Sequence, residues 1–153
     1  IQFYPPSLAF NKAIVDSSTH ADVYTVNKVN DGDATGTSYY ESASCPALIV
    51  IDLGDVYSLS CVVLSLPPSL LWESRTQNIE ILVSNDTNSY SASTTKFTSI
   101  VSAKDYLFDP ATGNRVLIEF EEVQCRYLKV VINSNSNVGG YGAQLSEISA
   151  YGA

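Results

Sequence analysis

Two segments at opposite ends of the chain carry oxygen-bearing side chains suited to a hard cation. Residues 30–42 contain Asp31 and Asp33 on either side of a glycine, followed by several threonine and serine hydroxyls. Residues 144–152 carry Glu147 in an otherwise apolar terminal segment. A buried carboxylate without a partner costs several kcal/mol, so Glu147 needs one. Calcium binds carboxylate, hydroxyl and carbonyl oxygens, and a calcium ion held by the first segment is one way to supply that partner.

Three segments, two of which overlap those above, combine aromatic side chains with planar polar ones. Sugar recognition uses this mixture, because aromatic rings stack on the apolar face of a pyranose while Arg, Glu, Asn and Gln bond its hydroxyls. The segments are residues 39–41, residues 71–75, which hold the only tryptophan, and the Ser/Asn/Gly-rich residues 133–144. The residues predicted to bind a ligand are Tyr39, Glu41, Trp72, Glu73, Arg75, Tyr141 and Gln144.

Some of these residues also have a structural interpretation. Tyr141 lies between glycines, which give it little local packing and favour an exposed platform. Trp72 has two interpretations, a ligand-stacking ring or a plug at the end of the core. Arg75 is predicted to contact ligand, although it could instead pair with Glu73 or Glu41.

The sequence argues against catalysis by this chain. His20 is the only histidine, and it follows two serines and a threonine with no recognisable nucleophile motif. A glycoside hydrolase needs two facing carboxylates, one of them with a raised pKa. The best loop carboxylates here are already assigned to the cation, so we predict binding without turnover.

Composition indicates one folded domain spanning residues 1–153, since 45% of the residues are hydrophobic and 16% are charged. The net charge of −8 argues against nucleic acid and anionic membranes, which need clustered Lys and Arg. The first residues lack the regions of a signal peptide, so we expect a mature secreted chain or a module of a longer one. Cys45, Cys61 and Cys125 are odd in number, which leaves open whether any disulfide forms.

Short β-rich runs alternate with turn signals along the chain, and no helix-period segment of convincing length separates them. A turn is predicted at Gly54 and Asp55. This pattern is typical of an all-β fold, an antiparallel sandwich or barrel, whose end loops carry the site. The predicted strands are residues 47–53, 56–66, 78–84, 115–120 and 126–133.

Three motifs, in this order, resemble a known family. Residues 50–59 are similar to an apolar strand ending in Asp-Leu-Gly, residues 125–130 to an Arg-Tyr strand, and residues 144–152 to a closing strand with Ser-Glu-Ile and Tyr-Gly. Over residues 8–152 the chain resembles the discoidin domains, also called coagulation factor V/VIII type C domains, and within them the family 32 carbohydrate-binding modules. The resemblance implies a discoidin-like jelly roll, an antiparallel β-sandwich of about eight strands with no catalytic activity.

The resemblance also implies a structural calcium ion between the N-terminal loop and the last strand. The spacing from Asp33 to Ser38 is two residues longer than the family's usual pattern, so Thr35, Thr37 and Ser38 stay open as the last loop ligand. Tyr40 stands where the family commonly has Trp, and we expect it in the core. The predicted metal ligands are Lys28 through its carbonyl, Asp31, Asp33, Ser38 and Glu147.

The function implied is that of a non-catalytic carbohydrate-binding module that directs a companion polysaccharide hydrolase to β-mannan, glucan or chitosan oligosaccharides. We expect the domain to be extracellular, monomeric and joined to a catalytic domain. The alternative is a discoidin-type adhesion or lipid-binding domain in which Leu70, Leu71 and Trp72 form an apolar spike. The net charge of −8 and the adjacent Glu73 count against lipid binding.

Overall fold

The structure, a computed structural model, describes residues 6–33, 38–136 and 142–152. Within these ranges there are eight strands, as the family resemblance implied, and the only helices are two short 3-10 turns. The elements are β1 (Ala13–Ser17), η1 (Val26–Asn30), β2 (Tyr40–Glu41), β3 (Ala47–Ser65), β4 (Arg75–Ser84), β5 (Thr98–Phe108), η2 (Pro110–Thr112), β6 (Arg115–Asn135), β7 (Gln144–Leu145) and β8 (Glu147–Tyr151).

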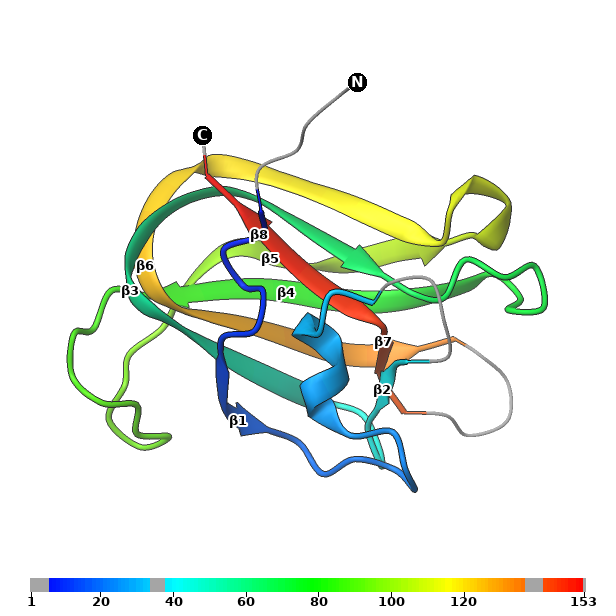
Figure 1. Cartoon of the computed structure of the whole chain (residues 1–153), viewed down its shortest axis with the longest axis horizontal. Helices are drawn as coiled ribbons and strands as arrows, with labels where there is room; N and C mark the ends of the chain where they lie inside the picture. The colour runs from blue at the N-terminus through cyan, green and yellow to red at the C-terminus, as the bar shows by residue number, and fades with distance from the viewer. Residues whose placement is uncertain (1–5, 34–37, 137–141, 153) are drawn as a thin grey trace.

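Strands β3 and β6 belong to both layers of the sandwich, and Figure 1 shows them bending together from one layer into the other. One layer has the order β1-β3-β6-β4-β5, and in the other layer β8 pairs with the second half of β3. The bend falls at a register shift between Asp52 and Tyr57, where Gly54 has a φ of 86°. All pairings in this sheet are antiparallel.

Two boundary predictions are wrong at this bend. Gly54 and Asp55 do not end a strand, because β3 runs through them and stays paired with β6 on either side. The strands predicted at residues 115–120 and 126–133 are likewise parts of one strand, β6. The glycine supplies the left-handed backbone that the bend requires without breaking the sheet.

The core lies between the layers and follows the alternation seen in the sequence. On β4, Ile79, Ile81 and Val83 are buried, and each such side chain contributes about 1.5–3 kcal/mol relative to an exposed one. The same inward face continues toward the start of β4 with Gln77 and Arg75, which are also buried. The alternation that builds the core therefore also carries two polar side chains inward at one end of the sandwich.

That end is where the short strands β2 and β7 pair, beside the loop that precedes β4 (Figure 1). Segment 19–24 joins the other side of β2, because the N–H of Ala21 donates to the carbonyl of Glu41 at 2.8 Å and the N–H of Glu41 donates to the carbonyl of Tyr24 at 3.2 Å. The loops at this end are thus tied to one another through Glu41.

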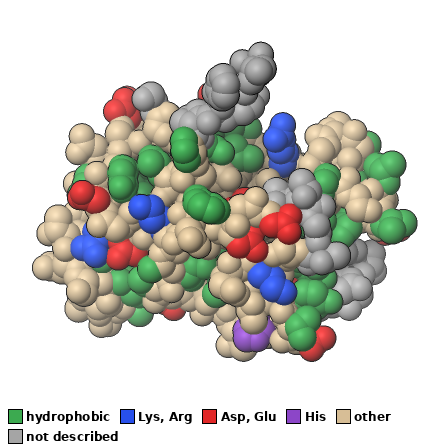
Figure 2. Space-filling view, in the orientation of Figure 1, with side chains coloured by type: hydrophobic (Ala, Val, Ile, Leu, Met, Phe, Trp, Pro, Cys, Tyr) green, Lys and Arg blue, Asp and Glu red, His purple; other side chains and the backbone are tan. Residues whose placement is uncertain are grey.

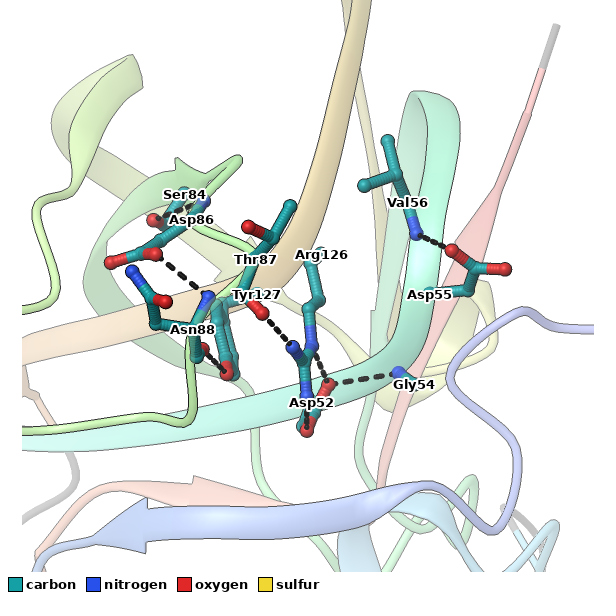
Figure 3. Close-up of polar contacts among 10 residues, drawn as sticks. All are labelled: Asp52, Gly54, Asp55, Val56, Ser84, Asp86, Thr87, Asn88, Arg126 and Tyr127. Atoms are coloured by element: carbon teal, nitrogen blue, oxygen red, sulfur yellow. Dashed lines mark hydrogen bonds and ion pairs between the residues drawn. The ribbon is translucent and has the colours of Figure 1, made fainter.

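At the opposite end, Arg126 holds the loop after β4 against the bend in β3 (Figure 3). Its Nε and Nη2 atoms each lie 3.0 Å from a carboxylate oxygen of Asp52, and its Nη1 donates to the carbonyl of Thr87 at 2.7 Å. The Asp52 carboxylate also accepts the N–H of Gly54 at 2.8 Å. The guanidinium of Arg126 holds the pKa of Asp52 below its ordinary value.

The described residues have scattered basic side chains and free cysteine thiols. In Figure 2, Lys and Arg side chains stand singly among acidic and uncharged ones on the face shown. Cys45, Cys61 and Cys125 are all free thiols. No helix in the described part of the chain is long and apolar enough to span a membrane.

Candidate functional site

Three buried polar side chains, Arg75, Gln144 and Glu41, form a connected line that we call the polar row. The Nη1 atom of Arg75 donates to Oε1 of Gln144 at 2.5 Å, and Nε2 of Gln144 donates to Oε1 of Glu41 at 2.8 Å. Their exposed fractions are only 3–8%. Buried polar groups need such partners, because each one left unsatisfied costs about 1–3 kcal/mol.

Contacts around Gln144 fix the orientation of its side-chain amide within the polar row. The amide of Gln77 makes a reciprocal pair with the backbone of Gln144, each bond measuring 2.9 Å. Asn135 adds a hydrogen bond to Oε1 of Gln144 at 3.1 Å. Because Oε1 already accepts from two donors, the amide nitrogen must face Glu41.

The Glu41 carboxylate keeps one oxygen for a ligand. Oε1 accepts from Gln144, whereas no hydrogen bond or ion pair within residues 6–33, 38–136 and 142–152 engages Oε2. A charged acceptor held in place by a neighbouring amide makes strong hydrogen bonds to hydroxyl or ammonium donors. Glu41 is therefore suited to bind such a donor on a ligand.

Three aromatic rings, Trp72, Tyr39 and Tyr24, make a second line beside the first, which we call the aromatic row. Tyr39 meets Trp72 edge-on with ring centroids 4.8 Å apart and stacks on Tyr24 with centroids 4.5 Å apart. The guanidinium carbon of Arg75 lies 4.8 Å from the centre of the Trp72 ring. This cation–π contact joins the aromatic row to the polar row.

The structure brings together most of the residues predicted to bind a ligand. Tyr39, Glu41, Trp72, Arg75 and Gln144 all belong to the two rows. Trp72 is only partly buried, so it contacts the core without being enclosed by it.

Of the other two predicted ligand-binding residues, only Glu73 lies within the described ranges, and its side chain does not join the rows. Glu73 is exposed, and its contribution to Arg75 comes from its backbone carbonyl, which accepts from Nε and Nη2 at 3.2 and 3.0 Å. Tyr141 lies outside the described residues.

Sequence reasoning missed three members of this end: Tyr24, Gln77 and Asn135. Gln77 had a readable signal, because it precedes Ile79 by two positions on the inward face of β4. Tyr40 lies in the core as expected, and its hydroxyl donates to the carbonyl of Ser18 at 2.9 Å. Burial raises the pKa of Tyr40 to about 12.

A second candidate site lies where Glu147 of β8 meets the loop after η1. The backbone N–H of Gly32 donates to both carboxylate oxygens of Glu147, at 3.1 and 3.3 Å. Ser38 donates its hydroxyl to Asp31 at 2.6 Å, and Asp31 accepts the N–H of Asp33 at 2.9 Å. Glycine is required at position 32, because its φ is 84° and an added Cβ would lie 2.7 Å from the Phe10 ring.

Acidic side chains gather at this second site and disfavour the charged form of the buried one. Glu147 is 6% exposed, and its pKa is raised to about 8, first by burial and then by the charge of Asp31, with Asp33 adding to the effect. The Gly32 N–H opposes the shift but does not cancel it. Carboxylate and hydroxyl oxygens are the donors that calcium prefers, so this donor set fits that ion.

The predicted metal ligands are only partly gathered. Asp31, Ser38 and Glu147 converge, and Lys28 lies on η1 with its ammonium bonded to the carbonyl of Val23 at 3.1 Å. No group of three His, Cys, Asp or Glu side chains with metal-holding geometry occurs among the described residues. The alternatives Thr35 and Thr37 lie outside the described ranges.

Comparison with known proteins gives one family match and many structural ones. The F5/8 type C domain model matches residues 13–147. No curated protein sequence matches the chain.

Three solved structures illustrate the fold. Chitosan-binding module 1 of a chitosanase/glucanase from Paenibacillus sp. IK-5, as a selenomethionine-labelled mutant, has a TM-score of 0.73 at 22% identity, covering 97% of this chain and 100% of that one. Chitosan-binding module 2 of the same enzyme, in complex with chitotriose, has 0.70 at 26%, covering 95% and 99%. CpGH89CBM32-5 from Clostridium perfringens, in complex with GalNAc-β-1,3-galactose, has 0.67 at 16%, covering 89% and 92%.

Proposed function

The chain belongs to the F5/8 type C domain family, and from that premise we propose that it is a non-catalytic carbohydrate-binding module. The observation that carries the proposal is the polar row beside the aromatic row. Glu41 offers a free carboxylate oxygen, and the ring of Trp72 contacts Arg75 at the other end of the polar row. Charge-assisted acceptors with adjacent aromatic surface are what sugar hydroxyls and sugar faces require.

The ligand we propose is an oligosaccharide of the β-mannan, glucan or chitosan type. Support comes from chitosan-binding module 2, which is 26% identical over nearly the whole chain and was solved with chitotriose. A carboxylate such as Glu41 serves an amino sugar as well as a neutral one. The module would direct a companion polysaccharide hydrolase to its substrate outside the cell.

We also propose that calcium stabilises the module at the second site. Glu147 is buried beside the exposed Asp31, which helps to raise its pKa to about 8, and a divalent cation would stabilise the ionised carboxylate. The ion would be structural and would tie the loop after η1 to β8. Asp31, Asp33, Ser38, Glu147 and the carbonyl of Lys28 are the proposed ligands.

Oligosaccharide binding by the isolated domain tests the main proposal. Titration calorimetry with manno-, gluco-, galacto- and chitosan series should give binding to at least one series. Trp72→Ala should weaken that binding at least tenfold, whereas Phe97→Ala, at the opposite end of the sandwich, should leave it within twofold. Failure of the wild-type domain to bind any series would contradict the proposal.

A second candidate function, lipid or cell-surface adhesion, is favoured by one observation. Leu70 and Leu71 are 77% and 93% exposed at the tip of the loop before β4. However, the nearest basic side chain along that loop, Arg75, is buried, and Glu73 is exposed, so the tip lacks charge for anionic lipid. Binding to phosphatidylserine vesicles that Leu71→Asp abolishes would move this function to first place.

A further inference from the structure

Tyr24 occupies a position next to the proposed binding residue Glu41. Its backbone carbonyl accepts the N–H of Glu41, and its own N–H donates to the carbonyl of Ala21 at 3.0 Å. Ala21 in turn donates to the carbonyl of Glu41. The backbone of Tyr24 is therefore hydrogen-bonded to Glu41, whose carboxylate has one oxygen free for a ligand.

The ring of Tyr24 ends the aromatic row on the side away from Trp72. It stacks on Tyr39 at 4.5 Å with an interplanar angle of 21°. Among the described residues no ring contact joins Tyr24 to Trp72, so the two rings reach each other only through Tyr39. The row thus has two ends, each with its own ring.

The hydroxyl of Tyr24 distinguishes it from tyrosines that brace the structure. Tyr40, Tyr90 and Tyr127 each donate their hydroxyl to an oxygen of the protein, at 2.9, 2.5 and 2.6 Å. Within the described ranges the Tyr24 hydroxyl has no such partner, and the residue is only partly buried. A tyrosine with a stacked ring and an unbonded hydroxyl offers a ligand both apolar surface and a polar handle.

We propose that Tyr24 is a second aromatic platform of the carbohydrate site, and that the site takes at least two consecutive sugar residues of a glycan chain. This inference rests on the proposed function. One pyranose stacks on one aromatic side chain, so a ligand that reaches both Trp72 and Tyr24 needs more than one sugar ring. Glu41, whose backbone is bonded to Tyr24 and whose side chain continues the polar row, would bond the sugars between them.

The test compares ligand length in wild type and in variants. Calorimetry uses gluco-, manno- and chitosan oligosaccharides of one to four units. Wild type should bind the tetramer of one series about tenfold more tightly than its monomer, and Tyr24→Ala should lose about three- to tenfold in tetramer affinity but less than twofold in monomer affinity. Tyr57→Ala removes a partly buried tyrosine near the bend in β3 and serves as the control.

Other outcomes overturn the inference. An equal loss at every ligand length would make Tyr24 a structural brace, and no loss at any length would exclude ligand contact. A wild-type affinity that is the same for every ligand length, together with weaker binding by Trp72→Ala, would reject the second platform while keeping the proposed function. No wild-type binding at all would reject both.

A second measurement avoids dependence on the folding of Tyr24→Ala. In wild-type protein, the ring resonances of Tyr24 should shift in NMR spectra when the tetramer is added and stay in place when the monomer is added. Ring resonances of Tyr57 should be unmoved by either ligand. Shifts of Tyr24 with neither ligand, in a protein that binds the tetramer, would refute the platform.

Discussion

The side-chain amide of Gln144 donates to a carboxylate oxygen of Glu41 at 2.8 Å, across the pairing of β7 with β2. Gln144 also accepts from Arg75, so one amide satisfies a buried cation and a buried anion at once. No hydrogen bond or ion pair among the described residues joins the guanidinium of Arg75 to the carboxylate of Glu41 directly. The stability of this end of the sandwich and its capacity to bind ligand therefore depend on the same side chain.

Replacing Gln144 by methionine should lower the free energy of unfolding by about 2–4 kcal/mol, because the volume is kept while two buried charged groups lose a shared partner. Urea unfolding measures the loss. Gln124→Met, at an exposed position on β6, is the control and should change stability by less than about 0.5 kcal/mol. If both variants unfold at the same urea concentration as wild type, the polar row does not contribute to stability.

Replacing Arg75 by lysine should weaken oligosaccharide binding at least fivefold and lower stability by about 1–3 kcal/mol. Arg75 uses Nε and Nη2 on the Glu73 carbonyl and Nη1 on Gln144, and an ammonium group cannot reproduce this fork. A lysine at this position also lacks the planar guanidinium that contacts the Trp72 ring. Arg115→Lys, exposed at the start of β6, should behave as wild type in calorimetry and in unfolding. Full binding by Arg75→Lys would show that only the positive charge matters.

The sequence predicted those parts of the fold that depend on local alternation. Ile79, Ile81 and Val83 face the core as their spacing required, and Arg75 and Gln77 follow the same rule into the site. The bend at Gly54 was predicted as a turn, because glycine and aspartate mark both features and only the pairing with β6 separates them.

The residues of the candidate site were predicted from their types, but the hydrogen bonds that join them were not. Arg75, Gln144 and Glu41 come from three separate segments, so their line of hydrogen bonds exists only once β2, β4 and β7 are placed. Tyr24 carries no sequence signal at all. Its stacking on Tyr39 depends on the path of an irregular segment between β1 and η1.

Removing calcium should lower the melting temperature of wild type by about 5–10 °C relative to a sample with calcium at 100 times its Kd, since a ligand that binds only the folded state stabilises it. Glu147→Gln should abolish this difference. At pH 9, above the raised pKa of Glu147, its metal-free form should also melt above metal-free wild type, because the neutral amide replaces a buried charged carboxylate beside Asp31.

Thermal unfolding in calcium and in excess chelator checks this expectation. Glu119→Gln, exposed on β6, should keep the full response to calcium. Identical melting of wild type in calcium and in chelator would reject the proposed ion.

The pairing of Asp52 with Arg126 should make stability depend on pH in the acid range (Figure 3). The Arg126 guanidinium, and to a lesser degree the Gly54 N–H, hold the pKa of Asp52 below its ordinary value. A carboxyl whose pKa is lowered by folding stabilises the folded state above its unfolded value of about 3.9, and this contribution is lost as the pH falls through the folded value.

Asp52→Asn should therefore cost about 1–2 kcal/mol at pH 7, a modest figure because both side chains are partly exposed, and almost nothing near pH 2. Asparagine keeps an oxygen that can accept the Gly54 N–H, so the substitution isolates the ion pair. Urea unfolding of both proteins from pH 2 to pH 7 measures the difference. Asp22→Asn, exposed and with a positive φ that asparagine tolerates, should show no such pH dependence. A cost for Asp52→Asn that stays constant across the whole range would show that shape or the Gly54 bond, and not charge, holds the loop after β4 against the bend.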